Sequence, residues 1–120
     1  MPSGWRLVAP ALALCAGLWG AAACSSAARS PFTVTERAIT VENQSRDAWD
    51  NVEVWLNDHY RVIKPRMAPG ERFDIPLNTF VAGFGQRFSP GRQIVKGIEV
   101  TATTGSGQAV RLVWGEGRRR

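Results

Sequence analysis

Hydrophobic and polar residues alternate with a period of two over most of the chain after residue 38. Side chains at every second position share one face of a β-strand, so each such run predicts a strand with one buried face. The inward members of the five runs are Ile39, Val41 and the polar Asn43; Val52, Val54 and Leu56; Phe73, Ile75 and Leu77; Ile94, Ile98, Val100 and Ala102; and Val110, Leu112 and Trp114. No comparable helical stripe occurs, so the pattern predicts an all-β body.

Turn-forming residues separate these runs. Asn57 and Asp58 tolerate positive φ and predict a tight hairpin. Pro69-Gly70 and Pro90-Gly91 each predict a type II turn, and residues 105–107 form a glycine-rich loop between the last two runs. About six or seven strands, spaced roughly ten residues apart, predict an antiparallel two-sheet β-sandwich of immunoglobulin or fibronectin type III character.

The N-terminal part of the chain has a different pattern. Arg6 is followed by an apolar run over 7–19 and by small residues at 20–23. This order of charged, hydrophobic and small residues is typical of a secretory signal, which we expect to form a hydrophobic helix. A retained membrane anchor is the alternative, because residues 7–28 carry no charge and are long enough to span a bilayer. Pro10 and the weakly apolar second half favour a cleaved signal.

The segment Ala21-Ala22-Ala23-Cys24 resembles the lipobox of bacterial lipoproteins. The resemblance covers only the signal and its junction, and it implies that Cys24 is diacylated on sulfur and becomes the N-terminus of the mature chain. Ser25 resembles the sorting context for the outer membrane, should the source be Gram-negative. Ala21 departs from the family pattern, in which a larger aliphatic residue, usually Leu, is commoner. Ordinary cleavage after Ala23 is therefore the alternative, and it would give a soluble periplasmic protein.

The count of cysteines favours lipidation independently of the resemblance. The chain has two, Cys15 and Cys24. Nine helical residues separate them by roughly 13 Å, which is too far for a disulfide. Once Cys15 leaves with the signal, the mature chain holds one thiol in an oxidising compartment, and acylation protects it.

These observations predict four segments: a signal peptide over 1–23, the lipidated cysteine with a polar tether over 24–31, a β-sandwich over 32–117 and a basic tail over 118–120. The net charge of the chain is +5 and its pI is about 10.2. Without Arg6 and the tail, the chain has 11 basic and 10 acidic residues, so nucleic acid is not an expected partner. The three tail arginines either reinforce contact with an anionic membrane or form a solubilising end.

Few residues are suited to catalysis. The single histidine, His59, stands beside Asp58, but neighbouring strand residues point to opposite faces and a third partner is missing. Asp47, Asp50 and Asp58 are too sparse for a calcium site. We therefore predict no cofactor, no metal and no enzymatic activity.

The most distinctive region of the body is the segment 78–88. Phe80, Phe84 and Phe88 recur every four residues and are expected on one face of an irregular connection. They either seal one end of the core or contact a partner together with Arg87, since aromatic residues and arginine are common interface hot spots.

Trp55 is a second candidate for partner binding, because it faces outward if its neighbours on the strand face inward. The sequence thus predicts a lipid-anchored, non-catalytic binding or structural module that faces the periplasm and meets an envelope protein or the cell wall. The alternatives are a soluble periplasmic binding domain and a small periplasmic enzyme or metal-binding domain.

Overall fold

The computed structural model describes residues 29–116. The chain divides into two compact units, Met1–Ser30 and Pro31–Arg120. The predicted signal helix, Cys24 and the basic tail lie outside the described residues. Within the described part of the chain, no helix has the length and apolar character needed to cross a membrane.

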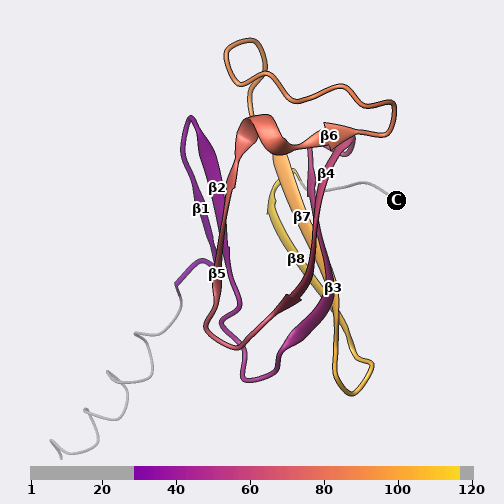
Figure 1. Cartoon of the computed structure of the whole chain (residues 1–120). Coiled ribbons are helices and arrows are strands. Elements are labelled where there is room, and N and C mark those ends of the chain that lie inside the picture. Colours follow the sequence, from indigo (N-terminus) through magenta and orange to yellow (C-terminus); the bar gives the residue numbers. More distant parts are fainter. Residues whose placement is uncertain (1–28, 117–120) are drawn as a thin grey trace, which may run out of the picture. The chain divides into compact units, whose positions relative to one another are not determined.

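The second unit consists of two antiparallel sheets that face each other (Figure 1). One sheet has the strand order β1-β2-β5 and the other has the order β6-β4-β3-β7-β8. The strands are β1 (Phe32–Val34), β2 (Ala38–Glu42), β3 (Trp49–Leu56), β4 (Tyr60–Met67), β5 (Arg72–Pro76), β6 (Val81–Ala82), β7 (Gly97–Thr104) and β8 (Ala109–Gly115), and the 3-10 helix η1 (Leu77–Thr79) precedes β6. The predicted all-β, two-sheet sandwich is confirmed.

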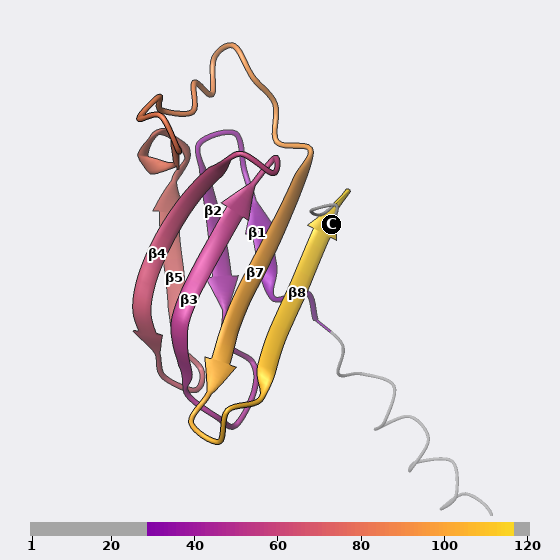
Figure 2. The same cartoon turned by 90° about the vertical axis from the view of Figure 1, so that its right-hand side faces the viewer.

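The strands divide between the sheets as in an immunoglobulin-type sandwich. β1, β2 and β5 form one sheet, whereas β3 and the last two strands lie in the other. β4 lies beside β3 and β6 lies beside β4, and these two strands widen the second sheet to five (Figure 2). The sequence pattern did not single out β4, because Pro65 and three basic residues interrupt its alternation.

The inward faces of both sheets form one core. Val52, Val54 and Leu56 of β3 are fully buried, as their alternation predicts. Trp49 of the same strand is also buried although it lies three positions before Val52. A bulge explains this: Asn51 has a φ of 52°, and the pairing of β3 with β7 shifts between Asp50 and Glu53. Because the bulge adds one residue between them, Trp49 and Val52 both point to the inner face.

The last long run begins later than the pattern predicts. β7 starts at Gly97, and Ile94, which was expected on its inward face, is 70% exposed. The Asn57 side chain causes this boundary, because its Oδ1 accepts the N–H groups of Lys96 (2.7 Å) and Gly97 (3.1 Å). Its Nδ2 donates to the Ile94 carbonyl (2.8 Å). These bonds hold residues 94–96 as a loop against the β3–β4 turn.

Three of the predicted turns are confirmed. Asn57 and Asp58 have φ values of 49° and 67° in the turn between β3 and β4. Gly70 has a φ of 81°, as the third residue of a type II turn requires, and Glu71 N–H donates to the Ala68 carbonyl (3.0 Å). The glycine-rich loop joins β7 to β8.

The type II turn predicted at Pro90-Gly91 is wrong. The N–H groups of Arg92 and Gln93 both donate to the Ser89 carbonyl (2.9 Å each), and Gly91 is not among the residues with positive φ. The chain therefore forms a single helical-type turn here, which does not need a left-handed glycine.

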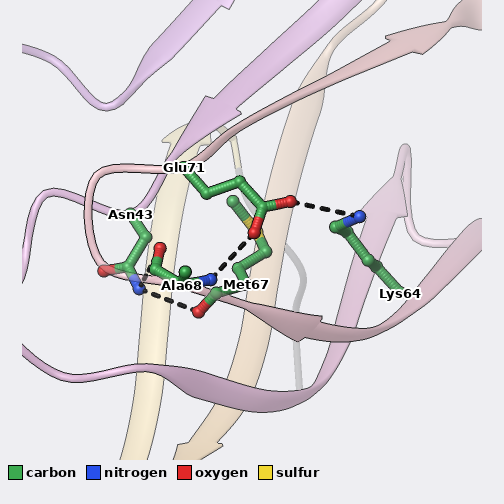
Figure 3. Close-up of polar contacts among 5 residues, drawn as sticks. All are labelled: Asn43, Lys64, Met67, Ala68 and Glu71. Atoms are coloured by element: carbon green, nitrogen blue, oxygen red, sulfur yellow. Dashed lines mark hydrogen bonds and ion pairs between the residues drawn. The ribbon is translucent and has the colours of Figure 1, made fainter.

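A buried asparagine links two connections at the end of the sandwich where β2 ends. Asn43 is 0% exposed. Its Nδ2 donates to the carbonyls of Asp47 (2.9 Å), Met67 (3.3 Å) and Ala68 (3.2 Å), and its Oδ1 accepts the N–H and the hydroxyl of Ser45 (3.0 and 2.7 Å). The side chain thus links the β2–β3 connection to the β4–β5 turn (Figure 3).

The backbone of Asn43 is held by the same turn. Its N–H donates to the Glu71 carbonyl (2.9 Å), and its carbonyl accepts the Gly70 N–H (2.7 Å). Glu71 in turn accepts the Ala68 N–H on Oε1 (2.8 Å) and pairs with Lys64 Nζ through Oε2 (3.2 Å; Figure 3). The bond from Ala68 and the Lys64 ammonium hold the pKa of Glu71 below its ordinary value of 4.5.

We expect Asn43→Ala to lower the free energy of unfolding by about 3 kcal/mol, because it leaves several buried backbone carbonyls without a donor. Asn43→Asp keeps the shape but removes the donors, so it should destabilise comparably. Urea denaturation measures both. Arg46→Ala, an exposed change in the same connection, should change the stability by less than about 0.5 kcal/mol, and equal effects would contradict the assigned role of Asn43.

We expect Glu71→Gln to lower the stability at pH 7. Since the folded pKa of Glu71 is depressed, the contribution of the carboxylate is present above the ordinary value of 4.5 and is lost as the pH falls through the folded value. The difference between the wild type and the variant should therefore close on acidification below pH 4.5. Urea midpoints across this range measure it. Glu36→Gln, at an exposed turn, should show a smaller difference.

Candidate functional site

A small hairpin projects from the end of the sandwich opposite Asn43. Val81 pairs with Arg87, Ala82 N–H donates to the Gln86 carbonyl (2.8 Å), and Gly85 N–H donates back to the Ala82 carbonyl (2.8 Å). Gly85 has a φ of 91°, a conformation that glycine adopts without strain. These bonds place Phe84 at the tip of the hairpin, where it is 78% exposed.

The other two phenylalanines lie in the core. Phe80 and Phe88 are 0% and 1% exposed, and Phe88 N–H donates to the Phe80 carbonyl (3.0 Å) across the base of the hairpin. The Phe88 ring meets Tyr60 edge to face, with 5.3 Å between ring centroids. Phe80 and Phe88 therefore close this end of the core and are not available to a partner in this fold.

The expectation that all three phenylalanines share one face is thus wrong. The chain reverses between Phe80 and Phe88, so these two meet at the base of the hairpin and Phe84 lies at its tip. A spacing of four residues gives one face only in a regular helix or strand. Of the aromatic residues predicted in this segment, only Phe84 is presented to solvent.

The hairpin adds a short strand to the edge of the five-stranded sheet. β6 pairs with the start of β4, with Arg61 opposite Val81, and β4 pairs with β3, with Arg61 opposite Trp55. Val81, Arg61 and Trp55 therefore form one row on the outer face of the sheet. The sheet brings Trp55 next to the hairpin, although the two are far apart in the sequence.

Polar contacts hold the Trp55 side chain on this face. Its Nε1 donates to Glu53 Oε1 (3.1 Å), and the Arg61 guanidinium carbon lies 5.2 Å from the centroid of the indole ring. Arg61 also pairs with Glu53 (3.8 Å). Trp55 is partly buried as a result, and these contacts hold its indole ring in one position on the outer face of the sheet.

A shallow groove of about 420 Å³ joins this face to the hairpin. Ile63, which is 55% exposed, adds an apolar side chain to it. The groove is lined by Trp55, His59, Arg61, Ile63, Val81, Ala82 and Gly83. We call the groove together with Phe84 and Arg87 the hairpin surface.

The segment that carries the hairpin is basic. Residues 77–96 contain Arg87, Arg92 and Lys96 and no acidic residue. Arg87 donates through Nη1 to the Asn78 carbonyl (3.2 Å), and it remains exposed. Such a surface favours partners with a negative potential.

Two larger hollows lie at the same end of the sandwich. One, of about 680 Å³, is bordered by Asp58, Arg92 and Glu116 and is mainly polar. The other, of about 700 Å³, is bordered by Val34 and Leu77 of the three-stranded side and by the exposed Ile94. Neither contains Phe84 or Trp55.

Between residues 29 and 116, no three His, Cys, Asp or Glu side chains gather closely enough to hold a metal ion. Asp47 lies beside Asn43 at one end of the sandwich, whereas Asp58 lies in the turn at the other. His59 is exposed on the rim of the groove.

No family model matches the chain, no curated protein matches it, and no solved structure matches it. The function must therefore be argued from the hairpin surface itself. Sequence analysis singled out Phe84, Arg87 and Trp55 within this surface, and it missed Ile63 and Val81. The alternation at the start of β4, before Pro65 interrupts it, would have placed Ile63 outward, had β4 been recognised as a strand.

Proposed function

We propose that the protein is an exported, lipid-anchored module of the cell envelope that binds a partner through the hairpin surface and has no catalytic activity. The proposal rests on the exposure of Phe84. Large aromatic side chains are usually buried, and this one is 78% exposed at the tip of a hairpin braced by backbone hydrogen bonds. A rigidly presented aromatic residue loses little conformational freedom on binding and can fill a pocket of a partner.

The position of the chain's entry to the sandwich supports the proposal. Glu42 N–H donates to the Pro31 carbonyl (2.9 Å), so the tether joins the sandwich near the end of β2, beside Asn43. The hairpin lies at the other end of the sheets, beside the start of β4. β3 has eight residues, which gives a separation on the order of 25 Å. A lipid on Cys24 would leave the hairpin free to face an envelope partner.

The charge of the segment narrows the chemistry of that partner. Arg87 and Arg92 flank the aromatic tip without a nearby acidic residue in the same segment. We therefore favour an envelope protein that offers an apolar pocket with an acidic rim. An anionic polymer of the cell wall supplies the acidic rim but not the pocket, so binding to it should depend on the arginines and not on Phe84.

The anchor is tested by the mass of the N-terminus. We expect the chain purified from membranes to begin at Cys24 with acyl chains on the cysteine, because small residues precede this thiol at the end of the signal. Intact-mass spectrometry measures this, and Cys24→Ser should release the protein into the soluble fraction. An unacylated N-terminus after Ala23 would give the soluble periplasmic alternative.

The contact surface is tested by capture from native membranes in detergent. We expect the Phe84→Ala variant to lose the captured partner. Its free energy of unfolding, measured by urea denaturation, should change by less than about 0.5 kcal/mol, since the side chain is exposed. Phe80→Ala should instead lose about 3 to 5 kcal/mol of stability.

Val113→Thr is the matched control, because it changes an exposed apolar residue on β8, outside the hairpin surface. It should retain the partner. Capture that survives Phe84→Ala and is lost with Val113→Thr would move the binding site away from the hairpin.

A further inference from the structure

The β8 strand is an open edge of the five-stranded sheet. It is the last strand in the order β6-β4-β3-β7-β8, and in the part of the chain that the structure describes no strand pairs with its outer side. Figure 2 shows it as the outermost strand of its sheet. It is seven residues long, and unpaired edges of this length readily pair with another strand.

The core is incomplete along this edge. Val54 and Val100 of the central strands are 0% exposed. Val110, Leu112 and Trp114, which point to the same inner side from β8, are only partly buried. The wider sheet has five strands and faces a sheet of three, so its β8 edge leaves apolar side chains in reach of water.

The other long edges carry residues that block strand addition, and β8 does not. β6 covers only the first two residues of β4, and the rest of that edge carries Lys64, Pro65 and Arg66. β5 carries two charged residues and ends with Pro76. Charged residues and proline are the usual protection of sheet edges. β8 has one charged residue, Arg111, and that residue pairs with Glu99 of its own sheet.

The hydrogen-bonding pattern shows which backbone groups of β8 are directed outward. Thr104 N–H donates to the Gln108 carbonyl and Glu116 N–H donates to the Lys96 carbonyl, one bond at each end of the β7–β8 ladder. Hydrogen-bonded pairs alternate in an antiparallel ladder. The N–H and C=O groups of Ala109, Arg111 and Val113 therefore point away from β7 and toward the open edge.

We infer that this edge binds a second copy of the chain, β8 against β8 in antiparallel orientation, so that two five-stranded sheets continue as one. A strand paired with its own copy about a two-fold axis is self-complementary. The inference does not rest on the hairpin surface, which lies at the opposite edge of the sheet.

The charges and side chains of β8 favour a register centred on Leu112. An axis at Arg111 would place the two arginines opposite each other, and like charges in that position are unfavourable. An axis at Leu112 pairs Arg111 with Val113 of the partner copy and matches their outward N–H and C=O groups. It also places Val110 against Trp114 on the inner side, a favourable pair of β-branched and aromatic residues.

The same arrangement is compatible with two lipid anchors. β1, where the chain enters the sandwich, belongs to the three-stranded sheet. A two-fold axis perpendicular to the shared sheet leaves both three-stranded sheets on the same side of it. Both tethers then begin on one side, from which they can reach one membrane, and both grooves open on the other.

Cysteine substitution tests the register in the full chain. In an antiparallel ladder, the Leu112 residues of the two copies form a non-hydrogen-bonded pair with about 4.5 Å between Cα atoms, which suits a disulfide. Two Val113 residues would be about 8 Å apart, beyond the range of a disulfide. We expect Leu112→Cys to form covalent dimers in membranes under mild oxidation, with at least about tenfold more than Val113→Cys. The chain without an introduced cysteine is the control for cross-linking through Cys15 or Cys24.

The mass of the full chain in detergent, measured by sedimentation, tests the pairing itself. Val113→Lys should favour the monomer, because the lysine meets Arg111 of the partner copy, whereas within its own chain it stands opposite Glu99. We expect the dissociation constant of the dimer to rise about tenfold or more. Val113→Thr should remain dimeric. At a protein concentration below the dissociation constant, where dimerisation does not add to the stability, both variants should keep the free energy of unfolding of the wild type within about 0.5 kcal/mol.

A monomeric wild type, or equal cross-linking of the two cysteine variants, would overturn the inference. Neither result would bear on the hairpin surface, since Phe84→Ala changes a residue at the other edge of the sheet.

Discussion

The sandwich depends on one buried polar side chain. Asn43 satisfies its amide, its N–H and its carbonyl entirely with backbone or near-neighbour groups of the β2–β3 connection and the β4–β5 turn. Each of these chain segments passes from one sheet to the other. Because an unsatisfied buried amide is costly, the network fixes where both segments cross, and hence how the two sheets are placed on each other.

The opposite end of the sandwich is built differently. Three aromatic side chains close the core with apolar contacts: Phe80, Phe88 and Tyr60. The chain between the two phenylalanines projects from the core as a hairpin. A rigid base and an exposed tip are what a contact loop requires, since the scaffold positions the side chain and the loop carries the specificity. The tether enters near the Asn43 end, so the two ends have separate tasks in the proposed function.

Much of the fold could be predicted because β-strands with one buried face leave a period of two in the sequence. Val52, Val54 and Leu56 are buried as the alternation requires, and Gly70 adopts the φ that its turn demands. β4 was missed because Pro65 and charged residues obscure the pattern on an edge strand. These residues protect the edge, so they reflect its place in the sheet rather than its local preference.

Local sequence by itself determined the five strands β2, β3, β5, β7 and β8, most turns and the candidates Phe84, Arg87 and Trp55, since each depends on neighbours along the chain. The tertiary structure decided that Phe80 and Phe88 are core residues, and that Trp55 joins the hairpin through β4. It also decided which edge of the sheet remains open. These properties depend on pairing between distant segments, and a periodicity contains no information about which strands become neighbours.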